Sequence, residues 1–459
     1  MKLGAVEMET LRMREAFERL AAMRFRHGGG QLTHERLVEY QATLANYAGL
    51  YAEDSGELLT PSRIAALHRE AGQVLEPSSI PRRTTPAPRS TTGALRVAIV
   101  SPDFRRHPVA FFIEPLLRNA DRARIELIGI STGTPDEFTA RLKTGFDTWH
   151  DASGSSLAQF NRSIRDIAPD VLVELAGFTI SHLLAALADH PAPVQATYLG
   201  YPNTTGCRFM DYRIVDSITD PPSSPRCTTE TLARLDPCFL CYKPDPRFLQ
   251  VPVAQPLSEG PFTFGCFNAA MKLSSSLLAA WATVLGATPG SRLLVKAMGM
   301  EDEPVRNHLR ARMERAGIDT RRVNIVGRTP DPLDHLKRYH QVHLALDTFP
   351  YNGTTTTCEA LLMGVPVLTL SGETHASRVG ASLLRAAGLP SLVCANVDEY
   401  TSRAADLAAD APAIQQLREG LRERFLASQL CDGVAYGKRL SDLLSQLWET
   451  SGPRPSVGA

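Results

Sequence analysis

Four threonines, Thr354–Thr357, stand where an apolar run has ended in Asp347 and a short Pro/Asn/Gly turn has followed. A second apolar run begins at Pro366, after Gly364. This pattern predicts strand, turn, helix and strand, with the threonines at the helix start. The first N–H groups of a helix have no intrahelical partner and lie at the positive end of its dipole, so this position favours a diphosphate. Threonine is also a common N-cap, so a purely structural role fits the same residues.

Two further side chains follow predicted strands. Lys272 comes after the strand Phe262–Phe267 and is the best candidate for a cation. His107 comes after the strand Leu95–Val100, and the ordinary pKa of histidine, near ~6.5, suits proton transfer at neutral pH. Side chains after parallel strands can face a ligand at the carboxyl edge of a sheet. An ordinary surface lysine and a structural histidine are the competing interpretations.

Three polar residues lie near the predicted anion site in sequence. His335 and Arg338 are three residues apart and share one face of a short helix, which also describes an ordinary solvated face. Glu359 follows the threonines by one helical turn, where a carboxylate can accept hydrogen bonds from the hydroxyls of a ribose.

Cys238 and Cys241 form a CxxC pair, but no second pair or nearby histidine completes a zinc site. We therefore expect no metal.

Composition narrows the class of protein. The 459 residues are 43% hydrophobic and 21% charged, with 49 basic and 49 acidic side chains. This balance argues against binding to a nucleic-acid polymer or an anionic membrane. No signal peptide or membrane span is recognisable, and eight scattered cysteines are typical of free thiols, so a cytoplasmic location is expected.

The pattern of elements predicts an α/β protein with two tandem Rossmann-like domains facing a cleft. Helical spacing marks the N-terminal segment, and Thr60-Pro61 is typical of a helix start. The expected organisation is a helical segment at 1–76, a Pro/Ser/Thr-rich linker at 77–94, α/β domains at 95–250 and 262–430, and a C-terminal helix and tail at 431–459. Ten strands are predicted, at Leu95–Val100, Ile125–Ile130, Val171–Leu175, Val194–Leu199, Phe262–Phe267, Arg292–Lys296, Val323–Val326, Val342–Leu346, Pro366–Leu370 and Leu392–Ala395.

The chain resembles the catalytic region of the O-linked N-acetylglucosamine transferases, including their SPINDLY-like relatives. The resemblance is carried by blocks at residues 95–109, 172–179, 192–212, 264–274, 334–338, 347–378 and 430–449. It implies a GT-B arrangement, a UDP-sugar donor such as UDP-GlcNAc, inversion at the anomeric carbon, and neither metal nor cofactor.

The resemblance also implies roles for individual residues. Lys272 and the hydroxyls of Thr354, Thr355 and Thr356 would hold the diphosphate, with Lys272 and His107 as the catalytic pair. His335 and Arg338 would contact the uracil, and Glu359 the ribose. The residues implied for the cleft of donor sugar and acceptor are Thr179, Leu199, Gly200, Tyr201 and Pro202.

Several positions depart from the family pattern. Thr354 stands where a histidine is frequent, Glu359 where aspartate is common, and Ala269 where a glutamine is usual. Asp170 replaces a family histidine, and His375 replaces an aliphatic residue. The loss of one amide contact at Ala269 would weaken nucleotide binding by about 1 kcal/mol.

The acceptor stays open at this point. The tetratricopeptide pattern that precedes this region in protein-modifying members is not found, so a protein Ser/Thr and a small molecule are both possible acceptors. Two other functions fit paired Rossmann domains: a UDP-sugar 2-epimerase and a non-catalytic sugar-nucleotide sensor. His107 and Lys272 favour the transferase.

Overall fold

The computed structural model describes residues 42–43, 45–47, 59–77, 93–223, 227–253 and 260–451. The predicted helical segment before residue 42, most of the predicted linker and the last residues of the tail lie outside this part. The chain forms two compact units. We call residues 61–243 together with 431–451 the first domain, and residues 244–430 the second domain.

The first domain is built on a seven-stranded sheet with the order β3-β2-β1-β4-β5-β6-β7, in which neighbouring strands run parallel. Its strands are β1 (Leu95–Ser101), β2 (Ile125–Ser131), β3 (Thr148–Asp151), β4 (Val171–Glu174), β5 (Val194–Thr197), β6 (Tyr212–Val215) and β7 (Thr231–Arg234). β4 and β5 are buried at every position, as expected where helices cover both faces of a parallel sheet.

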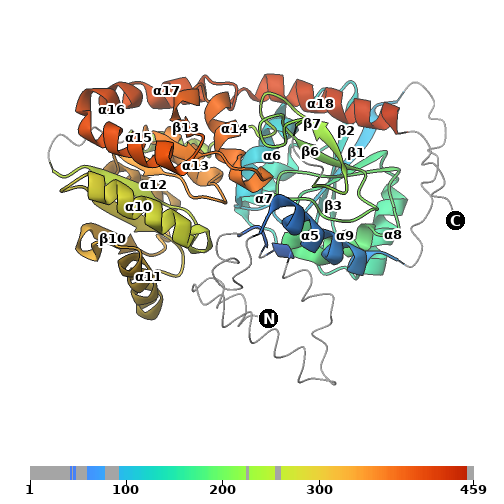
Figure 1. Cartoon of the computed structure of the whole chain (residues 1–459). Helices are drawn as coiled ribbons and strands as arrows, with labels where there is room; N and C mark the ends of the chain where they lie inside the picture. Colours follow the sequence, from blue (N-terminus) through green and yellow to red (C-terminus); the bar gives the residue numbers. More distant parts are fainter. Residues whose placement is uncertain are drawn as a thin grey trace, which may run out of the picture. The chain divides into compact units, whose positions relative to one another are not determined.

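The helices of the first domain come from three separate parts of the sequence. They are α5 (Pro61–Leu75), α6 (Pro108–Asn119), α7 (Glu137–Lys143), α8 (Leu157–Ile167), α9 (Ser181–Leu187) and α18 (Gly433–Thr450), with the 3-10 helix η1 (Gly177–Ile180). α5 begins at the predicted proline and buries Ile64, Leu67, His68 and Ala71, which share one helical face. The long helix α18 runs beside α6 (Figure 1). The structure thus assigns α5 and α18 to the first domain, although the sequence pattern treats both as separate segments.

The second domain holds a six-stranded parallel sheet with the order β10-β9-β8-β11-β12-β13. Its strands are β8 (Thr263–Cys266), β9 (Arg292–Lys296), β10 (Val323–Val326), β11 (Leu344–Leu346), β12 (Val367–Leu370) and β13 (Val393–Cys394). Its α-helices are α10 (Ser275–Ala287), α11 (Glu303–Arg315), α12 (Pro332–Lys337), α13 (Thr355–Leu362), α14 (Val379–Ala386), α15 (Val397–Ala409), α16 (Ala411–Arg418) and α17 (Leu421–Leu426).

Each sheet has one point at which the strand order reverses direction. In the first domain β1 lies between β2 and β4, and in the second domain β8 lies between β9 and β11. Open parallel sheets bind ligands beyond the carboxyl ends of the strands at such a point. His107 follows β1 and Thr179 follows β4, while Lys272 follows β8 and Thr354 follows β11. The order of the strands therefore places these four residues at the switch points of their domains.

All ten predicted strands are confirmed, with bounds that differ by at most two residues. The sequence pattern does not predict β3, β6 and β7. These strands have four residues each, and β3 and β7 form the two edges of the sheet. Most of β3 is exposed and β6 carries a buried arginine, so neither shows the apolar run that reveals the inner strands.

Two expectations from composition can be compared with the structure. No helix in the described part of the chain is long and apolar enough to cross a membrane. All eight cysteines lie within the described ranges as free thiols. Cys238 and Cys241 are buried, and the described residues include no group of histidine, cysteine and acidic side chains that could hold a metal ion.

Candidate nucleotide-sugar site

Lys272 ends the short 3-10 helix η3 (Ala270–Lys272), which follows β8. Its ammonium donates a hydrogen bond to the carbonyl oxygen of Asn352 at 2.6 Å and lies 3.9 Å from the ring centroid of Tyr351. Both partners belong to the turn between β11 and α13. Burial lowers the pKa of Lys272 to about 8, and the nearby Asp347 carboxylate opposes this shift. A cation is thus held beside the start of α13.

Asp347 fixes this turn from the end of β11. Its Oδ1 accepts hydrogen bonds from the backbone N–H groups of Gly353 at 2.6 Å and Thr348 at 2.8 Å. Its Oδ2 accepts one from the hydroxyl of Thr369 at 2.7 Å. Burial raises the pKa of Asp347, whereas these donors and Lys272 lower it. With Asn268 Nδ2 at 3.3 Å there are four donors, and four donors and a neighbouring ammonium suit a carboxylate, so we assign Asp347 as ionised.

The threonines at the start of α13 differ in their contacts. Thr354 occupies the N-cap position, yet its side chain makes no capping hydrogen bond. Within the described ranges, the hydroxyls of Thr354 and Thr355 are not hydrogen-bonded to any other residue. The hydroxyl of Thr356 instead donates to Asn268 Oδ1 at 2.8 Å. Two hydroxyls and the first N–H groups of α13 are therefore available to an anion, while Thr356 is already engaged with Asn268.

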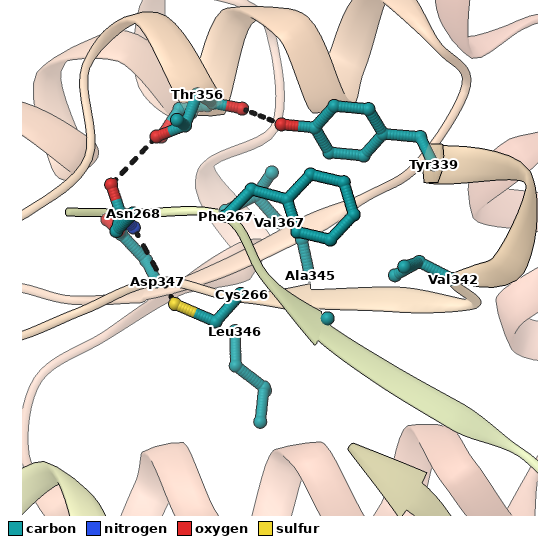
Figure 2. Close-up of a pocket in the computed structure, with 12 residues that line it drawn as sticks. Cys266, Phe267, Asn268, Tyr339, Val342, Ala345, Leu346, Asp347, Thr356 and Val367 are labelled. Carbon is teal, nitrogen blue, oxygen red and sulfur yellow. Dashed lines mark hydrogen bonds between the residues drawn. The ribbon is translucent and has the colours of Figure 1, made fainter. Parts of the chain in front are cut away.

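Figure 2 shows a small cavity that extends along β8 and β11 from Val342 to Thr356. Phe267 and Asn268 line it from the end of β8, and Thr356 lines it from α13. The Tyr339 hydroxyl donates to the carbonyl oxygen of Thr356 at 3.2 Å, and Asn268 Nδ2 donates to Asp347 Oδ1 at 3.3 Å. The rest of the lining is largely apolar, so the cavity suits no charged ligand. Its polar residues instead hold the start of α13 against the sheet.

The residues expected to bind the nucleoside come together in part. His335 lies in α12, and its Nε2 is 3.0 Å from Glu359 Oε2 in α13. Its ring centroid is 5.8 Å from those of Phe267 and Tyr339. His335 Nδ1 is enclosed and has no hydrogen-bond partner among the described residues. Arg338 follows as the C-cap of α12 and is half-buried.

Lys296 is a cation that the sequence analysis missed. It ends β9, the strand next to β8, and is buried. Burial lowers the pKa of Lys296, Glu359 opposes this shift and Arg338 adds to it. Its position as the last residue of a strand, next to the strand that leads to Lys272, is the sequence signal that could have identified it.

His107 is the N-cap of α6 in the first domain. Its Nδ1 accepts a hydrogen bond from the Val109 N–H at 3.3 Å and lies 3.6 Å from Asp103 Oδ2. Burial lowers the pKa of His107, and Asp103 opposes this shift. The neutral ring that caps α6 carries its proton on Nε2, so Nε2 is a hydrogen-bond donor. The side chain is 34% exposed, which leaves it accessible.

The remaining predicted cleft residues occupy two adjacent segments of the first domain. Thr179 is exposed in η1, and Leu199, Gly200 and Pro202 are part-exposed after β5. Leu199 has a positive φ of 47°. A β-carbon on Gly200 would lie 1.8 Å from the carbonyl oxygen of Leu175, so only glycine fits there. Tyr201 differs from the others because its side chain is buried and its hydroxyl bonds to His68, which the sequence analysis did not single out.

Four further residues have structural surroundings. Asp170 accepts a hydrogen bond from the Arg96 N–H at 2.7 Å, at the entry to the sheet. Cys358 is fully buried in α13 and His375 is buried in the 3-10 helix η6 (His375–Ser377). Ala269 is the N-cap of η3 and makes no side-chain capping bond.

Comparison with known proteins identifies the family. Its description is glycosyl transferase family 41, and its profile matches residues 61–248 and 252–440, so the chain belongs to this family. The chain is 40% identical over 359 residues to the probable UDP-N-acetylglucosamine–peptide N-acetylglucosaminyltransferase SPINDLY of Petunia hybrida. That alignment covers 77% of this chain and 38% of the petunia protein, so the chain spans well under half of that relative.

Solved structures agree with this assignment. A mutant of the Thermobaculum terrenum O-GlcNAc transferase superposes with a TM-score of 0.88 and 32% identity, covering 98% of this chain and 83% of that one. Sucrose-phosphate synthase from Thermosynechococcus elongatus shares the fold, with a TM-score of 0.50 and 12% identity over 77% of this chain and 99% of that chain. The expected pair of α/β domains of the GT-B type is thereby confirmed.

Proposed function

We propose that this chain transfers N-acetylglucosamine from UDP-N-acetylglucosamine to a serine or threonine hydroxyl of a protein. The observation that carries the proposal is the meeting of the Lys272 ammonium with the N-terminus of α13 at a switch point of the second sheet. A cation, free threonine hydroxyls and unpaired N–H groups form a binding site for a diphosphate. Membership of family 41 supports a nucleotide-sugar as its source.

In the proposed reaction the acceptor oxygen forms a bond to the anomeric carbon while the bond from that carbon to the diphosphate breaks. The hydroxyl gives its proton to water or to the departing diphosphate, and UDP leaves with the electron pair of the broken bond. Negative charge grows on the diphosphate, where Lys272, Thr354 and Thr355 stabilise it more strongly than in the ground state. Attack opposite the leaving group inverts the configuration, so the α-linked donor gives a β-linked product.

His335, Arg338 and Glu359 are proposed to bind the nucleoside. The ring of His335, which lies beside Phe267 and Tyr339, supplies a position for a base, and the nearby carboxylate of Glu359 supplies one for ribose hydroxyls. Because Glu359 is hydrogen-bonded to His335, a bound ribose has to share the Glu359 carboxylate with His335 or displace this hydrogen bond. Thr356 is proposed to act through its hydrogen bond to Asn268 and not as a phosphate ligand.

His107 is proposed to orient the acceptor or the donor sugar. The ring that caps α6 presents Nε2–H, which donates a hydrogen bond and cannot accept a proton. A role as general base would require the proton to move to Nδ1, facing Asp103. His107 Nδ1 lies 3.6 Å from Asp103 Oδ2, so a proton on Nδ1 can face this carboxylate. That arrangement requires Nδ1 to stop accepting the capping hydrogen bond from the Val109 N–H.

The test is product analysis with labelled UDP-N-acetylglucosamine and a cell extract split into protein and small-molecule fractions. Label in protein, with release of UDP and a β-linkage by NMR, is the expected result. Label in the small-molecule fraction would show that the acceptor is a small molecule and not a protein. UDP-N-acetylmannosamine would mark an epimerase, and an unchanged donor that still binds would mark a sensor. Other nucleotide sugars assayed in parallel check the choice of donor.

A further inference from the structure

Helix α5 contacts the segment after β5 at three points along one helical face. The residues involved are His68 and Gly72 in α5 and Glu76 directly after its last residue, each four positions apart, so they form a single stripe. His68 Nε2 is 2.9 Å from the hydroxyl of Tyr201. A β-carbon on Gly72 would lie 2.3 Å from the backbone of Gly206, so the two backbones are in close contact. α5 therefore packs directly on the segment 201–208.

The third contact, between Glu76 and Arg208, lies at the C-terminal end of this stripe. Glu76 Oε1 accepts a hydrogen bond from the Arg208 N–H at 2.7 Å, and its Oε2 accepts one from Arg208 Nε at 2.8 Å. The Arg208 side chain is largely exposed, whereas the side chain of Glu76 is buried, so this ion pair is only partly screened by solvent. Only the bond between His68 and Tyr201 links two buried polar groups, and it is the contact most able to fix the segment.

The direction of the bond between His68 and Tyr201 follows from the other ring nitrogen. His68 Nδ1 is 2.8 Å from the carbonyl oxygen of Ile64, which can only accept, so Nδ1 carries the proton. Nε2 is then the acceptor, and the Tyr201 hydroxyl donates to it. Burial lowers the pKa of His68 to about 4, so the ring stays neutral and the bond keeps this direction throughout the pH range of an enzyme assay.

Tyr201 in turn packs against the segment that leads to Thr179. Gly177 has a φ of +52°, and a β-carbon there would lie 2.4 Å from Tyr201 Cβ. The ring of Phe178 stands edge-on to Tyr201 at 5.7 Å between centroids and lies 6.2 Å from His68. A shift of the Tyr201 ring must therefore move residues 177–179 as well.

Glu174 ties the two segments together from the sheet. It accepts hydrogen bonds at 2.8 Å from the N–H groups of Ala176 and Gly177, and another from the hydroxyl of Thr197 at the end of β5. The segments after β4 and β5 thus form one interlocked unit. This unit contacts α5 through the buried hydrogen bond between Tyr201 and His68.

We propose that α5 is a positioning element for the predicted acceptor side of the site, and that His68 acts through Tyr201 on Leu199, Gly200 and Thr179. This inference rests on the proposed function, because it assigns these loops to the site. Neither residue is expected to touch substrate: the hydroxyl of Tyr201 is consumed by His68 in the interior. The contribution of His68 is to hold the backbone of the two loops in one arrangement.

The test is a double-mutant cycle with His68→Phe, Tyr201→Phe and the double variant. Each single change should lower kcat/KM for the acceptor by about tenfold, because small displacements of a positioning group are costly in rate. The double variant should lose no more than either single variant, since both remove the same bond. His68→Gln can donate to Ile64 and accept from Tyr201, and should recover most of the activity. The affinity for UDP should change less than about twofold, since the proposed nucleotide residues lie in the second domain.

Hydrogen exchange of residues 174–180 and 198–206 supplies a readout that does not need activity. Exchange should rise in both segments for His68→Phe and Tyr201→Phe, and stay at the wild-type level in Glu70→Gln, which alters an exposed side chain of the same helix. Unchanged exchange overturns the proposal whether or not the protein transfers sugar. A wild-type protein without transfer would refute the proposed function instead.

Two further outcomes also count against His68 as a positioning residue. Additive losses in the double variant would show that the two side chains act separately. A lower melting temperature together with a kcat/KM within twofold of wild type at low temperature would show a role in stability alone. If His68→Phe does not fold, Tyr201→Phe, which removes only a hydroxyl, provides the same test.

Discussion

The ammonium of Lys272 lies 3.9 Å from the ring centroid of Tyr351, on the turn that leads into α13. The cation is thus held by an aromatic face and by one carbonyl oxygen, at Asn352, and a lysine has three N–H donors. A second tyrosine, Tyr47, packs on Tyr351 with 5.1 Å between ring centroids. A charge fixed in this way needs little reorganisation when negative charge grows on a leaving diphosphate.

Lys272→Ala should abolish turnover. Removal of one charge-assisted contact to the leaving group costs on the order of 2–4 kcal/mol of transition-state stabilisation, and UDP affinity should fall as well. Lys272→Arg keeps the charge and is the matched control, with an intermediate rate expected. Single-turnover rates and calorimetry with UDP measure both effects, and a Lys272→Ala rate within threefold of wild type would contradict the assignment.

The pH dependence of UDP binding should report the titration of Lys272. Its pKa of about 8 in the folded chain is below the ordinary value of 10.5, so the ammonium is present below pH 8 and is lost above it. The association constant for UDP should therefore fall as the pH rises through 8. Asp347→Asn removes the charge that favours the ammonium, so the fall should begin at lower pH. Calorimetry from pH 6 to 10 on both proteins checks this, with Glu373→Gln as a control away from the network; coincident curves would exclude the coupling.

His107→Ala and His107→Asn separate a functional role from a capping role. Asparagine replaces the N-cap of α6, whereas alanine removes it at a cost of about 1 kcal/mol. Both variants should lose roughly 10²-fold in kcat, and only alanine should lower the melting temperature. UDP affinity should be unaffected in either case. Normal turnover in His107→Asn would show that the cap is the whole contribution of His107.

Transfer should persist in excess EDTA. Lys272, the hydroxyls of Thr354 and Thr355 and the start of α13 supply the positive charge and donors that a diphosphate requires. The initial rate should be unchanged after prolonged chelation and after addition of Mg²⁺ or Mn²⁺. Loss of activity with EDTA and recovery with either metal would show that this charge is insufficient.

His68 should make the protein less stable in mild acid. Its pKa of about 4 in the folded chain is below the ordinary 6.5, so between these values the unfolded chain binds a proton that the native chain does not. Stability attributable to His68 is therefore lost as the pH falls from 6.5 toward 4, by about 2 kcal/mol at pH 5. His68→Gln removes this proton uptake. Urea unfolding at pH 7.5 and pH 5 should show a smaller acid loss in the variant, and equal losses would place the titration elsewhere.

The sequence determined most of the fold because inner parallel strands and their following helices carry strong apolar periodicity. Strands such as Arg292–Lys296 and Val323–Val326 were predicted with the observed bounds. The exposed edge strand β3 and the short β6 and β7 gave no such signal. The positions of Lys272, His107 and the threonines after strand ends also followed from local pattern, since a parallel sheet brings its carboxyl ends to one edge.

Only the tertiary structure decided what each side chain contacts. Thr356 turns its hydroxyl to Asn268, 88 residues away in sequence, and Tyr201 turns its hydroxyl to His68, 133 residues away. The tertiary structure also assigns α5 and α18 to the first domain. Local pattern can show that a residue is buried or follows a strand. It cannot show which distant donor meets which acceptor, because that choice is made when buried polar groups pair during packing of the whole domain.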